Sequence, residues 1–226
     1  MTTRGEGVSG GAYELVVFDW DGTLMDSTAL IASCIQAACA DLGLPVPPES
    51  RARFVIGLGL ADSLDHVAPA LDEAGRRRLA TRYRELYLAR EHEAPLYAGV
   101  PELLRQLKGR GRRLAVATGK ARRGLERALD TTGLRPWFDE TRCADEGFAK
   151  PHPDMLLTLL DRTGVAPERT VMVGDTTHDL ELAANAGVDA VAVLYGAHDA
   201  ALLETRPARA RFASVEELGR WLLADA

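Results

Sequence analysis

The sequence predicts an α/β protein: a doubly wound, mostly parallel β-sheet with helices on both faces and an all-helical insertion near its start. Short apolar runs rich in Val, Leu and Ala alternate with helical stretches in the second half of the chain, as in successive βα units. A similar run lies near the N-terminus. Between that run and the next, residues 27–95 show helical patterns and no comparable strand, which indicates an insertion.

The expected strands are four apolar segments, each followed within two residues by Gly, Asp or Thr. They are Glu14–Phe18, Arg113–Ala117, Thr170–Val173 and Ala190–Leu194. Parallel strands need crossover connections, and the helical stretches between these segments supply them on both faces of the sheet. In such Rossmann-like sheets ligands bind beyond the carboxyl ends of the strands. Polar side chains just after each run are therefore candidate functional residues.

The insertion is expected to form a helical cap on this core. Helical patterns cover Thr28–Leu42, Leu60–Ala68 and Glu73–Glu93. Chain breakers mark its internal turn and its exit, namely Pro45, Pro47 and Pro48, and then Pro95, Gly99 and Pro101. We therefore predict an α/β core from residues 1–26 and 96–226 and a cap from residues 27–95. The polar, Gly-rich Met1–Gly11 is expected to be a loose tail.

Composition narrows the function classes. The chain has 33 acidic and 27 basic residues, a net charge of -6, which argues against nonspecific nucleic-acid binding. No apolar stretch approaches the roughly 20 residues of a membrane span, and the polar N-terminus lacks a signal-peptide core, so a cytoplasmic location is the default. The three cysteines form no CxxC pair, which favours buried thiols over disulfides or a zinc site; they are Cys34, Cys39 and Cys143.

Two carboxylates, Asp19 and Asp21, follow the first expected strand directly, and Gly22 lets the backbone turn there. Anions this close repel each other unless a cation or a proton lies between them, and a hard cation prefers oxygen ligands. As a lone string, this motif is equally typical of a loop whose aspartates cap backbone amides.

A second pair, Asp175 and Asp179, follows the expected strand Thr170–Val173. In a doubly wound sheet the two strand ends can be neighbours, which would bring four carboxylates together. Four carboxylates imply Mg²⁺.

Two further positions are suited to phosphate. Thr118 and Gly119 end another expected strand with a hydroxyl group and a flexible backbone at a helix start. Lys150 is one of only three lysines, beside 24 arginines, and lies in a loop before Pro151. It supplies a cation for the site, although an exposed loop lysine is the alternative.

Together these residues resemble the four ordered motifs of the haloacid dehalogenase superfamily. The motifs are Asp19-Trp-Asp-Gly-Thr23, Thr118, Lys150 and Gly174-Asp-Thr-Thr-His-Asp179. A helical insertion between the first two motifs resembles the cap of the phosphoglycolate phosphatase-like branch. The resemblance implies that Asp19 is a nucleophile that becomes an aspartyl phosphate, that Asp21 is the general acid and base, and that Thr118 and Lys150 hold the transferring oxygens.

The same resemblance implies a Mg²⁺ ion bound by the side chains of Asp19 and Asp175 and by the backbone carbonyl of Asp21. Asp179 would bind the ion, through water if not directly, or would orient Lys150. Asp21 argues against the dehalogenases proper, which lack this second Asp and need no metal. The absence of Lys from residues 27–95 argues against the phosphonate-cleaving and phosphomutase branches, which use a cap lysine.

The implied activity is that of a Mg²⁺-dependent phosphatase for a small phosphomonoester, with phosphoglycolate as the leading substrate. The alternatives are another sugar phosphate, a nucleotide or pyrophosphate, or a noncatalytic phosphate-binding module. The oligomeric state, monomer or homodimer, stays open.

Substrate selection is assigned to the cap segment Arg51–Leu60. Gly57 would let the cap backbone approach the leaving group, Arg51 or Arg53 would meet a substrate carboxylate, and Gly119 would contact the phosphate. The alternative is that the glycines only turn the chain and the arginines are solvated. His178 is a further candidate to line the site, and Trp20 either walls the site or packs in the core.

Overall fold

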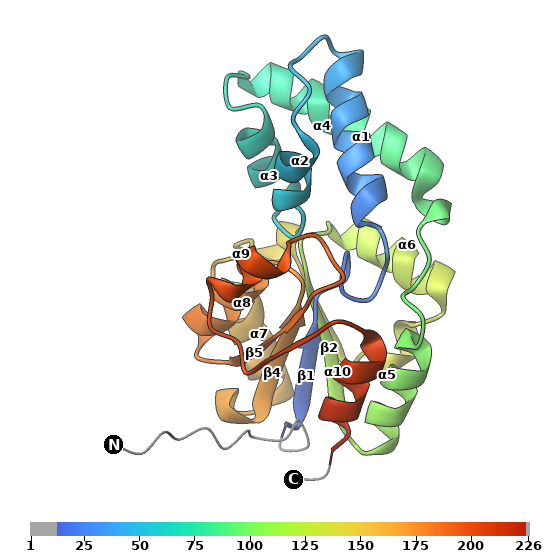
Figure 1. Cartoon of the computed structure of the whole chain (residues 1–226), viewed down its shortest axis with the longest axis vertical. Helices are drawn as coiled ribbons and strands as arrows, with labels where there is room; N and C mark the ends of the chain where they lie inside the picture. The colour runs from blue at the N-terminus through green and yellow to red at the C-terminus, as the bar shows by residue number, and fades with distance from the viewer. Residues whose placement is uncertain (1–12, 225–226) are drawn as a thin grey trace.

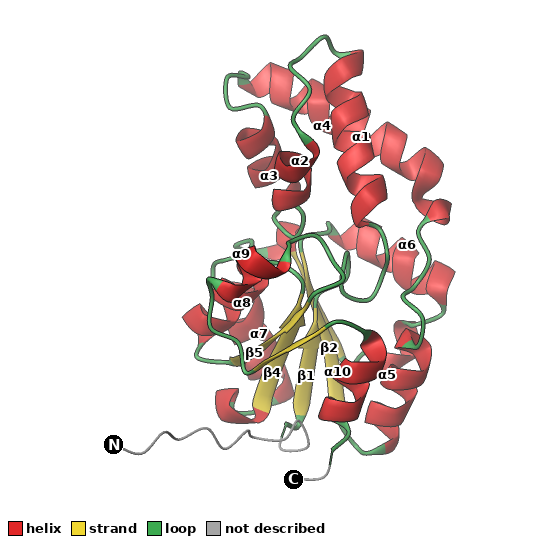
Figure 2. Cartoon of the chain, in the orientation of Figure 1, coloured by secondary structure: helices red, strands yellow, loops and turns green. Residues whose placement is uncertain are grey.

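The computed structural model describes residues 13–224, so the tail expected at Met1–Gly11 lies outside the described residues. Within that range the strands form a six-stranded, fully parallel sheet in the order β3-β2-β1-β4-β5-β6 (Figure 2). The strands are β1 Leu15–Phe18, β2 Arg113–Thr118, β3 Glu140–Cys143, β4 Thr170–Gly174, β5 Asp189–Val193 and β6 Ala210–Phe212. The predicted doubly wound parallel sheet is confirmed.

Helices cover both faces of this sheet (Figure 1). Side chains of α5 (Val100–Gly109), α6 (Arg122–Thr132) and α10 (Val215–Leu222) join one hydrophobic cluster, and those of α7 (Asp154–Thr163), α8 (Thr177–Ala186) and α9 (Ala200–Glu204) join the other. Along β1 the side chains alternate between the clusters, because successive residues of a strand point to opposite faces. Short 3₁₀ helices complete the described elements: η2 Glu91–Glu93, η3 Arg135–Trp137, η4 Ala144–Glu146 and η5 Pro167–Arg169.

The strands absent from the sequence prediction are β3 and β6, which lie at the two edges of the sheet. A central strand such as β1 is buried on both faces, so its sequence is a continuous apolar run. The edge strands are half-buried and carry charged residues, so they lack this pattern.

The segment between Asp26 and Pro95 contains only helices and their connections. The long helices α1 (Thr28–Asp41) and α4 (Glu73–Arg90) pack against each other above the sheet, with α2 (Glu49–Phe54) against α1 and α3 (Leu60–Val67) against α4 (Figure 1). The expected helical stretches correspond to α1, α3 and α4. Helix α2 was not expected.

The cap joins the core through two adjacent chain crossings. The backbone N–H of Asp26 donates to the carbonyl of Pro95 at 2.9 Å, and that of Tyr97 donates to the carbonyl of Leu24 at 3.0 Å. Met25 and Leu96 form an antiparallel bridge between the same crossings. This narrow neck is compatible with a cap that moves as a unit, and residues 27–95 remain our proposed cap domain.

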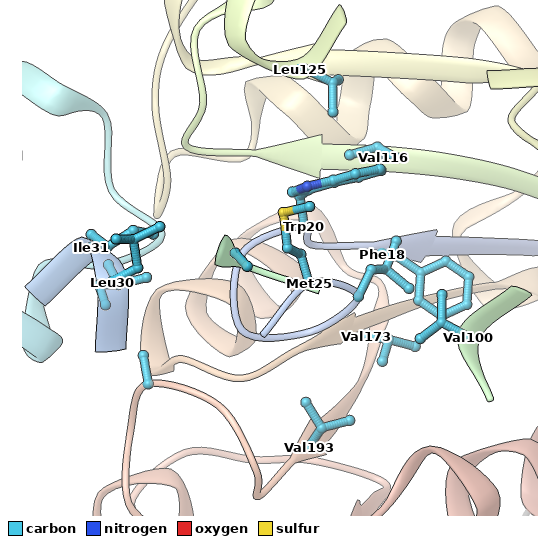
Figure 3. Packing of buried hydrophobic residues seen from close by; sticks show 14 of the residues in the cluster. Phe18, Trp20, Met25, Leu30, Ile31, Val100, Val116, Leu125, Val173 and Val193 are labelled. Atoms are coloured by element: carbon cyan, nitrogen blue, oxygen red, sulfur yellow. The ribbon is translucent and has the colours of Figure 1, made fainter. Parts of the chain in front are cut away.

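Trp20 packs in the core. Its side chain is fully buried, lies beside Val116 and Met25, and has its ring centroid 6.3 Å from that of Phe138 (Figure 3). Phe18 belongs to the same cluster (Figure 3). The residues flanking Trp20 direct their carboxylates to polar partners instead, so the first motif alternates between core and site.

Two further expectations concern composition. Cys34, Cys39 and Cys143 are buried free thiols, as predicted. The helices within residues 13–224 are too short or too polar to cross a lipid bilayer.

Glycine is required beside the carboxylates that follow β4. Gly22 has φ of 84°, and a Cβ there would lie 2.1 Å from Oδ2 of Asp175. A Cβ at Gly196 would lie 2.2 Å from Asp175, and one at Gly174 would lie 2.3 Å from Asp179. Because these neighbours are buried carboxylates, they have no room to move aside.

We predict that Gly22→Ala lowers the free energy of unfolding by at least about 3 kcal/mol, because it combines a left-handed backbone with this clash. Gly187 is the matched control, since its φ is 68° and a Cβ there meets no atom within 4 Å. Gly187→Ala should cost only about 1–2 kcal/mol, the price of the left-handed conformation. Urea unfolding of both variants measures the difference. Equal losses of unfolding free energy would show that the close approach to Asp175 adds nothing to the cost of Gly22→Ala.

Candidate active site

Three carboxylates meet beyond the carboxyl ends of β1 and β4. Asp19 directly follows β1 and Asp175 directly follows β4, and parallel pairing of Phe18 with Val173 brings the two strand ends together. Asp179 lies in the first turn of α8. One oxygen atom from each carboxylate lies within 4.8 Å of the others, and all three residues are buried.

Lys150 lies between two of these carboxylates. Its Nζ donates to Oδ1 of Asp19 at 2.7 Å and to Oδ1 of Asp179 at 2.6 Å. The residue is 2% exposed, which excludes the alternative of an exposed loop lysine. Burial alone would lower the pKa of Lys150, but the charges of Asp179 and Asp19 raise it above its ordinary value. Lys150 therefore stays an ammonium ion.

The other carboxylate oxygens have partners with one exception. Asp175 accepts from the Thr23 hydroxyl at 2.8 Å and from the backbone N–H of Ala197 at 2.7 Å. Asp179 accepts from the backbone N–H and the hydroxyl of Thr176. Oδ2 of Asp19 is buried without a hydrogen-bond partner among the described residues.

The cluster carries more negative charge than its own cation neutralises. Three carboxylates face one ammonium ion. Burial raises the pKa of Asp19 well above its ordinary value, even though Lys150 opposes the shift. Burial and the charge of Asp179 together raise the pKa of Asp175 to about 7. At neutral pH, Asp19 and Asp175 are therefore harder to ionise than free carboxyl groups, and a further cation beside them would favour their charged forms.

A hard divalent cation fits this donor set. The cluster offers closely spaced carboxylate oxygens, including the unpartnered Oδ2 of Asp19, and neither nitrogen nor sulfur donors. Such oxygen-only sites suit Mg²⁺ rather than softer metals. The sequence placed four carboxylates together, and the side chain of the fourth, Asp21, lies elsewhere.

Asp21 is held by two side chains that link the core to the cap. The Ser27 hydroxyl donates to Oδ1 at 2.7 Å, and Lys120 Nζ donates to Oδ1 and Oδ2 at 2.9 and 3.0 Å. The same ammonium donates to the Tyr87 hydroxyl, on cap helix α4, at 3.0 Å. Removal from water would lower the pKa of Lys120, but Asp21 and Tyr87 raise it above its ordinary value.

The sequence prediction missed Lys120 and Tyr87. Lys120 follows Thr118 by two residues and is one of only three lysines, so its place in the second motif was a usable signal. Tyr87 lies within the strongly charged helix α4, and its position there gives no such signal.

The second motif lies directly beneath the cap. Thr118 ends β2, is 1% exposed, and accepts the backbone N–H of Lys120 at 3.2 Å through its hydroxyl oxygen. A Cβ at Gly119 would lie 2.4 Å from the carbonyl oxygen of Leu58 and 2.6 Å from that of Gly57. Gly57 has φ of 91° and approaches the Thr176 side chain. Gly57 thus lies where the cap backbone meets Gly119 and Thr176, and its approach to a leaving group stays a prediction.

Arg53 does not occupy the position expected of a substrate ligand. Its Nη2 donates to the carbonyl of Gly196 at 2.7 Å and its Nε donates to that of Ala197 at 3.2 Å. The backbone N–H of Ala197 holds Asp175, so Arg53 ties the cap to the loop that supports the carboxylate cluster. Arg51 is exposed on α2 and lies outside the cavity described below. Helix α2, which the sequence did not predict, fixes the directions of both side chains.

His178 and His198 bind the backbone of Phe54, the cap residue after Arg53. Their Nε2 atoms lie 2.8 and 3.0 Å from the carbonyl oxygen of Phe54, and the Phe54 ring stacks on His198 at 5.2 Å between centroids. Burial lowers the pKa of both histidines, so they are neutral donors to this carbonyl. His178 contributes to docking of the cap and does not line the cavity.

A cavity of about 860 Å³ lies between the cap and the core. Helices α1, α3 and α4 supply its cap side, and α6 with the segment 144–149 supplies its core side. Asp21 and Lys120 are among its lining residues. The leaving group of a substrate that reacts at the strand ends would therefore enter this cavity.

Comparisons with known proteins identify relatives of this chain. A relative from Dickeya dadantii, named as the probable phosphatase IndB, is 40% identical over 81% of this chain and 82% of its own length. The tyrosine-protein kinase PtkA of Mycobacterium tuberculosis is 36% identical over 83% of this chain, which spans 64% of that protein. A phosphoglycolate phosphatase of Pseudomonas syringae is 31% identical over 88% of this chain and 76% of its own length.

Solved structures share this fold. A protein of Bacteroides fragilis described as a haloacid dehalogenase-like hydrolase superposes with a TM-score of 0.84 at 25% identity, over 91% of this chain and 99% of its own. A family model described as haloacid dehalogenase-like hydrolase matches residues 16–193, a range that holds all four motifs. The expected class of enzyme, a hydrolase, is confirmed: the chain belongs to the haloacid dehalogenase-like hydrolase family.

Proposed function

We propose that the protein is a Mg²⁺-dependent phosphatase that transfers the phosphoryl group of a small-molecule phosphomonoester to Asp19 and then to water. The observation that carries this proposal is the buried cluster of Asp19, Asp175 and Asp179, with Lys150 as its only close ammonium ion and Oδ2 of Asp19 unpartnered among the described residues. Relatives named as phosphatases support the same reading.

Asp19 would act as the nucleophile. One of its carboxylate oxygens forms a bond to phosphorus while the bond from phosphorus to the alcohol oxygen breaks, which splits hydrolysis into two displacements. Lys150, 2.7 Å from Oδ1 of Asp19, would offset the repulsion between that carboxylate and the incoming phosphate dianion. The hydroxyl of Thr118, at the end of the neighbouring strand β2, would contact a phosphoryl oxygen.

Asp21 would move the protons. In its protonated form it gives a proton to the departing alcohol oxygen, and as a carboxylate it then takes a proton from the water that attacks phosphorus. The second displacement releases inorganic phosphate and restores Asp19. Lys120 and Ser27 would hold the Asp21 side chain at the wall of the cavity, where the leaving group lies.

The residues suited to hold Mg²⁺ are Asp19, Asp175 and the backbone carbonyl of Asp21, with Asp179 binding directly or through water. When bound, the ion neutralises charge that develops on the transferring phosphoryl group. This chain's own contribution is to keep the carboxylates dry and fixed by Thr23, Thr176 and the amide of Ala197.

Phosphoglycolate is a candidate substrate because relatives such as the Pseudomonas syringae enzyme carry that name. Other sugar phosphates, nucleotides and pyrophosphate remain alternatives, as does phosphate binding without turnover. The similarity to a protein named as a tyrosine kinase raises a second possibility, in which a hydroxyl group rather than water accepts the phosphoryl group from Asp19.

We predict that Asp19→Asn abolishes Mg²⁺-dependent phosphate release from a chromogenic aryl phosphate, with a loss of at least about 10³-fold because the nucleophile is removed. The control is Asp161→Asn, at an exposed position on α7, which should keep wild-type rates. Absence of turnover in the wild type, or full activity in Asp19→Asn, contradicts the proposal. Transfer to a tyrosine peptide in place of phosphate release would favour the kinase-like alternative.

We predict that Asp175→Asn gains stability relative to the metal-free wild type as pH rises from 5 to 8. Burial raises the pKa of Asp175 from 3.8 to about 7, so the folded wild type binds more protons than the unfolded chain between these values and loses stability as pH rises through them. Thermal unfolding at pH 5, 6.5 and 8 measures the difference. If the difference in stability between Asp175→Asn and the wild type stays constant across this pH range, the raised pKa of Asp175 is contradicted.

Mg²⁺ should stabilise the wild type at pH 8, by about 5–10 °C in Tm at 100 times its Kd, and should not stabilise Asp175→Asn. Lys108→Met, at a surface pair with Asp139, is the control and should keep the full Mg²⁺ response. An unchanged response in Asp175→Asn would remove this residue from the metal site.

We predict that Lys120→Met lowers kcat by about 10- to 100-fold, because the Asp21 side chain loses the ammonium ion that orients it. Its Mg²⁺-dependent rise in Tm should equal that of the wild type, which separates a positioning role from general unfolding. Lys108→Met serves again as the control and should keep wild-type kcat. A Lys120→Met variant with wild-type kcat contradicts this role.

A further inference from the structure

We propose that the natural substrate is a phosphomonoester whose alcohol part is a bulky, largely apolar and uncharged body of about the size of a fused ring pair. This inference rests on the proposed phosphatase activity and narrows its substrate class. It follows from the size, the walls and the charge balance of the cavity between cap and core.

The cavity is far larger than the two-carbon leaving group of phosphoglycolate requires. Its volume of about 860 Å³ lies in the upper part of the roughly 300–1,000 Å³ range of pockets that bind drug-sized ligands. A glycolate leaving group beside Asp21 and Lys120 would leave most of the wall in contact with water.

The walls of the cavity are mainly apolar. On the cap side they include side chains from α1, the segment 55–60 and α4, and these are Ile31, Ile35, Val55, Ile56, Leu58, Leu60, Tyr83 and Leu88. Sugars and pyrophosphate would bury hydroxyl groups or charges wherever they lie against this apolar part of the wall, which is costly. A leaving group with an apolar body avoids this cost.

Two exposed side chains mark where such a body would contact the protein. Leu88, on cap helix α4, is 45% exposed, and Phe148, on the core segment before Lys150, is 63% exposed; both line the cavity. Exposed large apolar side chains that gather at one cavity are typical of a binding surface. A substrate between Leu88 and Phe148 would cover both at once, from the cap side and the core side.

The charges that line the cavity nearly cancel, so charge does not favour a second anionic group on the substrate. Lys120 is paired with Asp21, and Arg127 is paired with Glu91 just outside the lining. The side chains of two further arginines, Arg84 and Arg123, have no ion pair or hydrogen bond within residues 13–224. Two aspartates, Asp62 and Asp145, also line the cavity and carry the opposite charge. Apolar contact is therefore the main source of selectivity.

The test compares phosphate esters of primary alcohols, so that the leaving oxygen is chemically similar, using the full chain with Mg²⁺. The esters are phosphoglycolate, 2-phenylethyl phosphate and 2-(2-naphthyl)ethyl phosphate. We expect kcat/KM to rise along this series, by roughly 10- to 100-fold from the first to the last, because the ring system leaves water. A kcat/KM for phosphoglycolate equal to or above that for the naphthyl ester overturns the inference.

Two variants examine the cavity itself. Leu88→Ala should lower kcat/KM for the naphthyl ester about 3- to 10-fold and leave phosphoglycolate unchanged, since it removes apolar contact distant from the reacting atoms. Leu157→Ala is the matched control, because Leu157 is a similarly exposed leucine, 49%, on helix α7 and outside the cavity lining. Equal kinetics for both variants count against the inference.

Gly124→Leu places an apolar side chain in the cavity at a position with room for a Cβ atom. Gly124 lies on α6, lines the cavity, and a Cβ there meets no atom within 4 Å. Leu also favours the helix over Gly, so the variant should fold. We expect it to lower kcat/KM for the naphthyl ester at least about 10-fold while sparing phosphoglycolate. If both esters keep their wild-type rates, the leaving group does not occupy this cavity.

The outcomes separate this inference from the proposed function. If no ester is hydrolysed, both fail. If the esters are hydrolysed in an Asp19-dependent manner without preference for the bulky one, the phosphatase stands and the substrate class is wrong. A nucleoside monophosphate that outperforms the naphthyl ester would likewise replace the proposed class.

Discussion

The repulsion among Asp19, Asp175 and Asp179 is the constraint on which the rest of the structure depends. Parallel pairing of β1 with β4 places two of these carboxylates, Asp19 and Asp175, side by side out of water. Burial, and next the negative charge of Asp179, raise the pKa of both. Lys150 offsets part of that charge. Glycines next to the cluster leave no space for the carboxylates to separate. The folded core thus holds a charge excess that a divalent cation would neutralise.

The cap is tied to the same cluster by specific bonds. Arg53 donates hydrogen bonds to two carbonyl groups of the loop 196–197. The backbone N–H of Ala197, in the same loop, donates to Asp175. On the other side, Tyr87 of the cap accepts from Lys120, which holds Asp21. Opening of the cap would therefore break contacts to the groups that hold Asp175 and Asp21. This linkage gives a physical route by which occupancy of the cavity and the arrangement of the reacting groups can influence each other.

The sequence predicted those site residues that directly follow a recognisable strand. Asp19 and Asp175 were found because a polar residue that ends a buried apolar run in a parallel sheet lies at the ligand-binding edge. The edge strands and α2 escaped because half-buried elements lack a clear apolar pattern. The position of Lys120 beside Thr118 marked it as a candidate, but its role could not be assigned from the sequence, since its partner Asp21 is 99 residues away. The bonds of Arg53 to two core carbonyl groups could not be predicted, because those partners lie more than 140 residues away in the sequence.

The central claim is that the carboxylate cluster makes Asp19 the covalent carrier of the phosphoryl group. The most direct measurement is rapid acid quenching during turnover, followed by reduction with borohydride and peptide mass spectrometry to locate the phosphorylated side chain. The account predicts a single acyl phosphate at Asp19, formed as fast as the ester is cleaved. An acyl phosphate at Asp21, or release of phosphate with no covalent species at any time during turnover, would contradict it.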